Sequence, residues 1–155
     1  MDNDILMPLV MDPTSVFWKQ NRIKTFNNWP FKTSDKCNAK SMIAAGFYVI
    51  GNIDEPDLVE CFICGKQLDG WEPHDDPWDE HVKHQSDCPF VQLNKPDEKD
   101  WTVYEMYHLY TKYQIRNYMN ELNKISFALK DEAAASKSDL LSAYKTSQKN
   151  KKSTD

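Results

Sequence analysis

The chain has 155 residues, enough for one small domain and an appendage. Its formal charge is −5, which argues against a protein whose main role is to bind the phosphate backbone of nucleic acids. It has no apolar run of about 18 residues, and acidic residues stand at the N-terminus where a secretory signal needs basic ones. We therefore expect an intracellular protein without a membrane span.

Composition divides the chain into five parts. A break at Lys95-Pro96-Asp97 follows a region dense in aromatic residues and turn signals, and neither proline nor glycine occurs after it. The C-terminal residues are polar with few apolar positions, so we expect them to be disordered. The predicted parts are an N-terminal arm over 1–20, a compact domain over 21–93, a linker over 94–101, a long helix over 102–142 and a disordered tail over 143–155. The arm is expected to be loose apart from a few apolar anchors, namely Leu9, Val10, Val16, Phe17 and Trp18.

Short helices and strands are predicted inside the compact domain. Gly46 ends a first helix, and Pro77 is suited to the first position of a second. In chain order, the expected elements are a helix over 38–45, strands over 47–50, 59–63 and 67–71, and a helix that opens at Asp76. After the linker, Thr102 and Glu105 fit a capping box, so the long helix is expected to start there.

Three cysteines and one histidine have the spacing of metal ligands, Cys-x2-Cys-x16-His-x6-Cys. The four candidates are Cys61, Cys64, His81 and Cys88. A Cys-x2-Cys pair on a tight turn brings two thiolates together, and the later histidine and cysteine can complete a tetrahedron. Such a closed set leaves no open position for water or substrate. The pattern therefore indicates one structural Zn²⁺ and argues against metal catalysis.

Two further residues of metal-binding type fit this set less well. His84 lies on the same expected helix as His81 and is an alternative ligand, but Cys88 supplies a thiolate and is preferred. Cys37 is interpreted as an ordinary buried thiol, because disulfides are disfavoured in an intracellular protein. The competing interpretation is a chance clustering of reactive residues, which the agreement between ligand spacing and the neighbouring turn and helix signals disfavours.

Around the ligands the sequence resembles the baculoviral inhibitor-of-apoptosis repeat (BIR) family. The matching motifs are Arg22 to Pro30 (RIKTFNNWP), Met42 to Tyr48 (MIAAGFY), Pro56 to Phe62 (PDLVECF), Gly70 to Pro73 (GWEP), Asp76-Pro77, His81 and Cys88. One repeat followed by a long helix, with no RING finger, is similar to the survivin group of the family. The resemblance implies an α+β fold, namely a small zinc-stapled domain with a three-stranded antiparallel sheet and short helices, followed by a long C-terminal α-helix.

The same resemblance implies a function and partners. Survivin-like proteins are non-enzymatic adaptors of the chromosomal passenger complex. Their repeat reads the phosphorylated N-terminal tail of histone H3, and their helix binds borealin and the inner centromere protein, which connects them indirectly to an Aurora-type kinase. We accordingly expect a location at the centromere and the spindle midzone during division and in the cytoplasm otherwise. A role in restraining apoptosis, directly or indirectly on caspases, is the alternative function.

A strongly acidic segment surrounds Trp71. Between Asp54 and Glu80 there are ten acidic residues, and Lys66 is the only lysine or arginine. This charge attracts cations and repels nucleic acid. An aromatic wall beside carboxylates suits an ammonium group such as a free protein N-terminus, and an adjacent strand can pair with an extended peptide. The plainer interpretation is a solvated acidic face around a core tryptophan.

Seven positions match the family's peptide groove. They are Lys66, Leu68, Asp69, Trp71, Asp75, Glu80 and His84. By the resemblance, Asp69 and Asp75 would hold the ammonium group and Glu80 a neighbouring basic side chain. The two apolar members would wall the first alanine of the peptide. Lys66 and His84 would face the phosphate, where a cation and an imidazole donor are chemically suitable.

The expected long helix carries two apolar stripes in different phases. The earlier stripe consists of Val103, Met106, Tyr107 and Tyr110, and the later one of Ile115, Tyr118, Leu122, Ile125 and Leu129, which follows the spacing of a coiled-coil seam. The earlier stripe can pack on the domain or on a second copy of it, and the later one on helices of other chains. By the resemblance, Trp101, Val103, Met106 and Tyr107 match a homodimer contact. The alternative is that the whole helix folds back on its own domain.

Other classes of function are less well supported. A ubiquitin ligase would need a second zinc module, and only Cys37 remains unused. Direct caspase inhibition in this family relies on segments outside the zinc core, and residues 1–20 contain no such recognisable segment. The basic C-terminal residues from Lys145 to Lys152 can touch nucleic acid weakly, but the acidic domain makes specific binding unexpected. We expect neither a nucleic acid nor a membrane as a partner.

Overall fold

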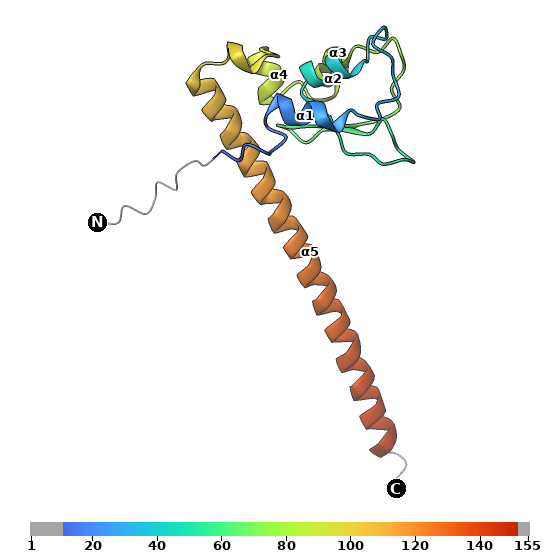
Figure 1. Ribbon diagram of the computed structural model, residues 1–155. Helices are drawn as coiled ribbons and strands as arrows, with labels where there is room; N and C mark the ends of the chain where they lie inside the picture. The colour runs from blue at the N-terminus through green and yellow to red at the C-terminus, as the bar shows by residue number, and fades with distance from the viewer. Residues whose placement is uncertain (1–10, 152–155) are drawn as a thin grey trace, which may run out of the picture. The chain divides into compact units, whose positions relative to one another are not determined.

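A computed structural model describes residues 11–151, and the chain divides into two compact units after Arg116. The elements are α1 (Lys19–Thr25), α2 (Ala39–Ala44), β1 (Phe47–Val49), β2 (Val59–Cys61), β3 (Gln67–Leu68), α3 (Pro77–His84), α4 (Pro89–Leu93), the 3-10 helix η1 (Glu98–Asp100) and α5 (Val103–Lys151). Figure 1 shows the short helices α1 to α4 gathered in the first unit. None of the helices within 11–151 is both long and apolar enough to cross a membrane.

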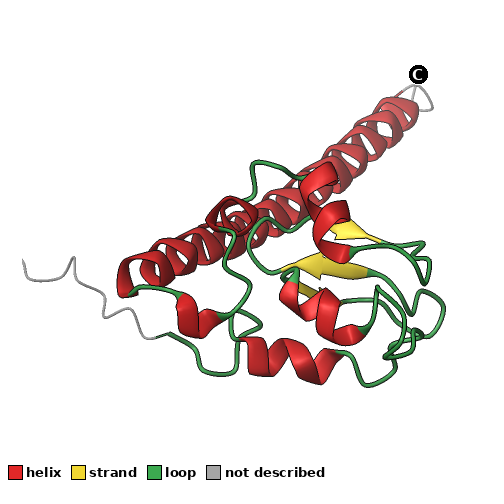
Figure 2. Cartoon of the chain, turned by 90° about the horizontal axis from the view of Figure 1, so that it is seen from above, coloured by secondary structure: helices red, strands yellow, loops and turns green. Residues whose placement is uncertain are grey.

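The strands form one antiparallel sheet in the order β1-β2-β3, with short helices around it (Figure 2). Phe47 pairs with Cys61, and Val59 pairs with both Val49 and Leu68. Side chains of β2 alternate, since Val59 and Cys61 are buried whereas Glu60 between them is half-buried. This confirms the α+β fold and the three-stranded antiparallel sheet.

All three expected strands end earlier than predicted, and β1, expected over 47–50, ends at Val49. We expected strands over 59–63 and 67–71, but β2 ends at Cys61 and β3 at Leu68. After Cys61 the chain turns immediately, and Gly70 has φ +70°, a left-handed conformation that ends extended pairing. The residues that follow β2 and β3 therefore form turns and do not extend the sheet.

Local signals fix the helix ends. The Asn38 side chain accepts a hydrogen bond from the Ser41 N–H at 3.0 Å and starts α2. After α2, Gly46 has φ +87°, and a Cβ there would lie 2.8 Å from the Phe90 ring, so glycine is required. Asp76 caps α3 by accepting hydrogen bonds from two N–H groups of its first turn. The helices α1, α4 and η1 were not predicted. Neither α1 nor α4 has the side-chain cap that marks the start of α2 and of α3.

The core is aromatic and includes part of the N-terminal arm. Phe17, expected to be an anchor of the arm, is fully buried and packs edge-on against Phe62 and Tyr110. Full burial of such a side chain contributes about 2–3 kcal/mol. The arm is therefore part of the folded unit from Met11 onward, and α1 already begins at Lys19. The expected anchors Leu9 and Val10 lie outside the described residues.

The long helix begins as predicted and extends further. Thr102 Oγ1 accepts from the Glu105 N–H at 3.2 Å, and Glu105 Oε2 accepts from the Thr102 N–H at 2.7 Å, which is the expected capping box. The predicted end was residue 142, yet α5 continues to Lys151. Residues 143–151, which were predicted to belong to a disordered tail, are thus helical, because this segment contains no helix breaker. Residues 152–155 lie outside the described part.

Candidate metal centre and peptide groove

The four predicted ligands meet at one point. Cys61 ends β2, Cys64 lies in the turn after it, His81 lies on α3, and Cys88 precedes α4. Their ligand atoms all lie within 4.8 Å of one another. Tetrahedral zinc geometry requires about 3.8 Å between two sulfurs and about 3.6 Å between sulfur and imidazole nitrogen. The Sγ atoms of Cys61 and Cys88 are 4.0 Å apart, and Cys64 Sγ lies 3.5 Å from His81 Nε2, so the cluster fits one metal ion.

Backbone groups hold the ligands in this arrangement. The turn over residues 61–65, hereafter the knuckle, closes with a hydrogen bond from the Gly65 N–H to the Cys61 carbonyl at 3.0 Å. Gly65 has φ +71°, which allows this tight turn. His81 Nδ1 lies 2.8 Å from the Ala45 carbonyl, so Nδ1 carries the proton and Nε2 faces the thiols. Each contact presents a ligand atom to the shared centre.

The electrostatics of the cluster favour a cation at its centre. Burial raises the pKa of the Cys61 thiol. Burial also lowers the pKa of His81, but hydrogen bonds with Cys64 and Cys88 outweigh it and raise that pKa to about 9. In the absence of a metal, protons must therefore balance the negative charge that gathers on the sulfurs. A bound metal ion would take the place of these protons.

A small cavity lies beside α3. It has a volume of about 90 Å³ and is lined by Leu68, Asp69, Gly70, Trp71, Asp75, Glu80 and His84. Six of the seven predicted groove residues thus come together. Lys66 does not line the cavity, since it lies before β3, at the knuckle end. Gly70 was missed, although its place between Asp69 and Trp71 is a signal for a chain that turns at the rim of the groove.

Several groove residues are held by interactions within the protein. Asp75 Oδ2 accepts from the Glu72 N–H at 2.7 Å, which orders the loop before α3. Glu80 pairs with Lys83 at 3.1 Å and with His84 Nε2 at 3.3 Å. Trp71 is only 8% exposed and packs edge-on against Phe47, so it is both a core residue and a wall of the cavity. The two interpretations of Trp71 that the sequence left open are therefore compatible.

The residues expected at a dimer contact separate into two groups. Trp101 packs against Phe17, and its indole N–H donates to the Lys95 carbonyl at 2.8 Å. Met106 also packs against the core. Val103 and Tyr107, in contrast, are exposed. The face of α5 that contacts the domain consists of Met106, Leu109, Tyr110 and Tyr113, a stripe shifted from the predicted one.

The later apolar seam is open to solvent. Ile115 belongs to the end of the first unit, and Tyr118, Leu122, Ile125 and Leu129 belong to the second. All five are more than half exposed. Apolar side chains at coiled-coil spacing that remain exposed along a helix are suited to pairing with another helix.

Two arginines that contact the knuckle, Arg22 and the partly buried Arg116, were not predicted. Arg22 lies within the Arg22-to-Pro30 motif and is fully buried, and Arg116 on α5 donates a hydrogen bond to the Cys61 carbonyl at 2.6 Å. A lone basic residue on a helix usually marks a solvated face. The one local signal for a side chain packed against the knuckle was Gly65, whose missing Cβ leaves room there.

The fold and the cluster together define a protein with one zinc-type BIR domain and an appended helix. The BIR family, described as the Inhibitor of Apoptosis domain, matches residues 22–92. This interval contains all four candidate ligands and all seven predicted groove residues.

Relatives narrow this class further. "Baculoviral IAP repeat-containing protein 5.2-A" of Xenopus laevis is 39% identical over 122 residues, covering 77% of this chain and 75% of that protein. The 5.2 protein of Xenopus tropicalis is 38% identical over 117 residues, covering 74% of each. "Baculoviral IAP repeat-containing protein 5" of Cavia porcellus is 44% identical over 84 residues, 54% of this chain and 59% of that protein. The chain belongs to the baculoviral IAP repeat family, in the survivin group that these proteins represent.

Proposed function

We propose that this chain is a non-enzymatic adaptor of the chromosomal passenger complex. Its BIR domain binds the N-terminal tail of histone H3 phosphorylated at the threonine near its N-terminus. Its helix α5 binds borealin-like and inner-centromere-protein-like helices, and through them an Aurora-type kinase. The observation that carries the proposal is the cavity beside α3, where carboxylates and an indole converge on a rigid metal-type domain.

The metal is proposed to be one structural Zn²⁺. Three thiolates and one imidazole are the donors that zinc prefers, and four protein ligands complete its tetrahedron. No coordination position is left for a substrate, which supports a non-enzymatic role. Bound zinc would fix the relation of the knuckle to α3, and thereby the shape of the groove between β3 and α3.

The composition of the groove supports recognition of a free N-terminus. Asp69 and Asp75 bring negative charge to a cavity whose volume of about 90 Å³ suits an alanine-sized side chain. The α-ammonium group of a peptide would bind these carboxylates through charge-assisted hydrogen bonds. The methyl group of the first alanine would contact Leu68 and Trp71. His84 at the cavity and Lys66 outside it are the candidate partners for the phosphate.

A peptide titration tests this function. A phosphorylated H3 tail peptide should bind the zinc-loaded protein, and acetylation of the peptide N-terminus should abolish binding. Asp75→Asn should weaken binding by about tenfold or more, because one charge-assisted hydrogen bond is worth about 1.5–3 kcal/mol. Asp54→Asn is the matched control, since Asp54 is exposed and lies outside the cavity. Lys66→Gln should reduce only the preference for the phosphorylated peptide. Equal binding by wild type and Asp75→Asn would contradict the proposal.

Localisation and the choice of partners follow from this function. We propose that the protein resides at centromeres and the spindle midzone during division, and in the cytoplasm otherwise. A homodimer of the free protein would use the exposed residues Val103 and Tyr107 at the start of α5.

The second candidate function is inhibition of apoptosis. It is favoured by the family itself, whose domain is described as an Inhibitor of Apoptosis domain. Direct action on caspases would appear as inhibition of a purified caspase by the purified chain. An effect in cells without such inhibition would indicate an indirect role.

A further inference from the structure

Two arginine side chains, one fully buried and one partly buried, contact the knuckle of the metal cluster. Arg22 on α1 is fully buried, with its guanidinium 4.1 Å from the centre of the Phe62 ring, and Phe62 follows the ligand Cys61 directly. Arg116 on α5 approaches the same segment, and its side chain is only 15% exposed. A buried charge is costly unless it is paired. The partners of these two arginines therefore indicate their purpose.

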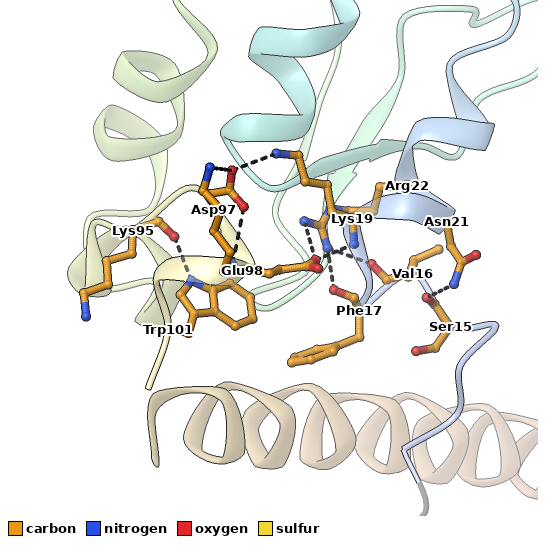
Figure 3. A network of polar contacts seen from close by, with 11 residues as sticks. Ser15, Val16, Phe17, Lys19, Asn21, Arg22, Lys95, Asp97, Glu98 and Trp101 are labelled. Carbon is orange, nitrogen blue, oxygen red and sulfur yellow. Dashed lines mark hydrogen bonds and ion pairs between the residues drawn. The ribbon is translucent and has the colours of Figure 1, made fainter. Parts of the chain in front are cut away.

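Arg22 joins the knuckle to the segment before α5. Its guanidinium donates to the carbonyls of Val16 and Phe17 at 3.1 and 2.5 Å, and pairs with Glu98 of η1 at 3.4 Å (Figure 3). The Phe62 ring under its guanidinium belongs to the knuckle. Figure 3 shows Glu98 and Asp97 reaching α1 from the side of the linker, where Lys19 pairs with Asp97 at 3.6 Å.

Arg116 joins the knuckle to α5. Its Nη1 donates to the Cys61 carbonyl at 2.6 Å, the same oxygen that accepts the Gly65 N–H and closes the knuckle. Its Nη2 pairs with Glu60 at 3.1 Å. A Cβ at Gly65 would lie 3.2 Å from the Arg116 side chain, so the glycine leaves the space that the guanidinium uses.

Glu60 is itself fixed in place, which sets the position of Arg116. The Tyr48 hydroxyl donates to Glu60 Oε1 at 2.5 Å, and the Gln67 amide donates to Oε2 at 2.8 Å. Glu60 alternates along β2 with the buried Val59 and Cys61, so Arg116 contacts β2 on the side opposite to these two side chains. The positions of both arginines are thus determined by several partners each.

The charge of the metal cluster gives a reason for guanidinium groups beside the knuckle. Three thiolates carry one more negative charge than a divalent metal ion neutralises. Arg116 on the Cys61 carbonyl and Arg22 over the Phe62 ring bring two guanidinium groups to the knuckle, where they would stabilise that excess charge because screening by solvent is weak. Groups that contact ligand residues from outside commonly change metal affinity by about 10–100-fold.

We propose that Arg22 and Arg116 couple metal binding in the cluster to the docking of residues 98–116 on the domain. At one end of this segment, Glu98 pairs with Arg22, which lies over Phe62 of the knuckle. At the other end, Arg116 donates to the Cys61 carbonyl. Zinc binding that orders the knuckle favours docking of the segment, and a docked segment increases zinc affinity by the same factor. The inference rests on the structural zinc proposed above. The two arginines act as positioning residues, since neither is a metal ligand.

Competition for zinc with a chromogenic chelator tests the coupling in the full chain. Arg116→Gln should raise the zinc dissociation constant about tenfold. Lys112→Gln is the matched control, because it removes the same charge one turn earlier on α5 from an exposed position. It should change the dissociation constant less than twofold. Arg116→Lys should recover part of the affinity, because it restores the charge without the two-pronged geometry.

Hydrogen exchange supplies a second readout at saturating zinc. Backbone amides of residues 103–116 should exchange faster in Arg116→Gln than in wild type or in Lys112→Gln. If Arg116→Gln does not fold even with excess zinc, the comparison of Arg116→Lys with wild type decides, and equal zinc affinities would overturn the coupling. Equal affinities of Arg116→Gln and Lys112→Gln would overturn it as well while leaving the zinc intact. A wild-type protein without zinc would instead overturn the proposed structural metal.

Discussion

At the scale of single residues, the metal cluster depends on groups that are not ligands. His81 presents Nε2 to the cluster because its Nδ1–H is used by the Ala45 carbonyl. Gly65 adopts the left-handed conformation that lets the knuckle close around Cys61. Asp76 starts the helix that carries His81, Glu80 and His84, and so it positions residues of both the metal cluster and the cavity beside α3.

The cap at Asp76 gives a prediction at this scale. Asp76→Ala removes the acceptor for the Trp78 and Asp79 N–H groups, which lie 3.0 and 3.3 Å from its carboxylate. The expected cost is about 1 kcal/mol of unfolding free energy. Chemical denaturation of the zinc-loaded protein measures it, with Asp54→Ala as a control on an exposed acid. A loss no larger than that of the control would show that Asp76 does not stabilise α3.

At the scale of elements, α5 combines two different environments in one helix. Its first turns bury Leu109, Tyr110 and Tyr113 against the domain, whereas the seam from Tyr118 onward is exposed. The periodicity of the sequence predicted two phases, because the helical spacing of apolar residues shifts between them. It could not tell which phase faces the domain, since that depends on aromatic partners such as Phe17 that come from the other end of the chain.

Glu105 at the start of α5 gives a pH-dependent prediction. Hydrogen bonds from Lys95 and from the Thr102 N–H, together with the charge of Lys95, lower the pKa of Glu105 to about 2 from an ordinary 4.5. Because the pKa is lower in the folded state, the stabilisation is complete above about pH 4.5 and is lost as the pH falls toward 2. The difference in unfolding free energy between wild type and Glu105→Gln should shrink over this range. Denaturation of both proteins measures it, and contributions of the metal cluster cancel in the difference. A difference that grows on acidification would contradict the assignment.

The exposed seam gives a prediction about partners. Leu122→Glu should abolish co-purification with borealin-like and inner-centromere-protein-like helices, because it places a charge in an apolar seam. Zinc content should not change, since Leu122 lies in the second unit. Asn120→Glu, two positions earlier and on the other side of the helix, should leave co-purification intact. Undiminished co-purification of Leu122→Glu would remove the seam from the proposed interface.

At the scale of the whole molecule, features that depend on local spacing could be predicted from the sequence, whereas those that depend on long-range contacts could not. The four metal ligands were predicted from the spacing of cysteines and histidine around one turn and one helix, and the six lining residues of the groove from the resemblance to the BIR family. The pair of Arg22 and Glu98 joins residues 76 positions apart, and Arg116 reaches Cys61 from 55 positions away. No local pattern indicates such pairs. The N-terminal arm was therefore expected to be looser than it is from Met11 onward.

The metal cluster joins the end of β2, the knuckle, α3 and the residue before α4 at one point, and the proposed peptide groove and adaptor role depend on this cross-link. Small domains built from such short elements commonly gain stability from a structural metal. Binding of a structural zinc ion supplies folding free energy directly. Loss of one ligand should therefore cost the domain its cooperative fold, whereas changes on the exposed helix should not.

The most direct test is the zinc content of the purified, reduced chain, measured together with its thermal unfolding. Elemental analysis should find one zinc per chain in the wild type, and Cys64→Ser should lose the metal and the cooperative unfolding transition. Cys37→Ser, which changes a buried cysteine outside the cluster, should keep the metal. A wild-type protein without zinc, with an unfolding transition unchanged in Cys64→Ser, would contradict a zinc-stabilised domain.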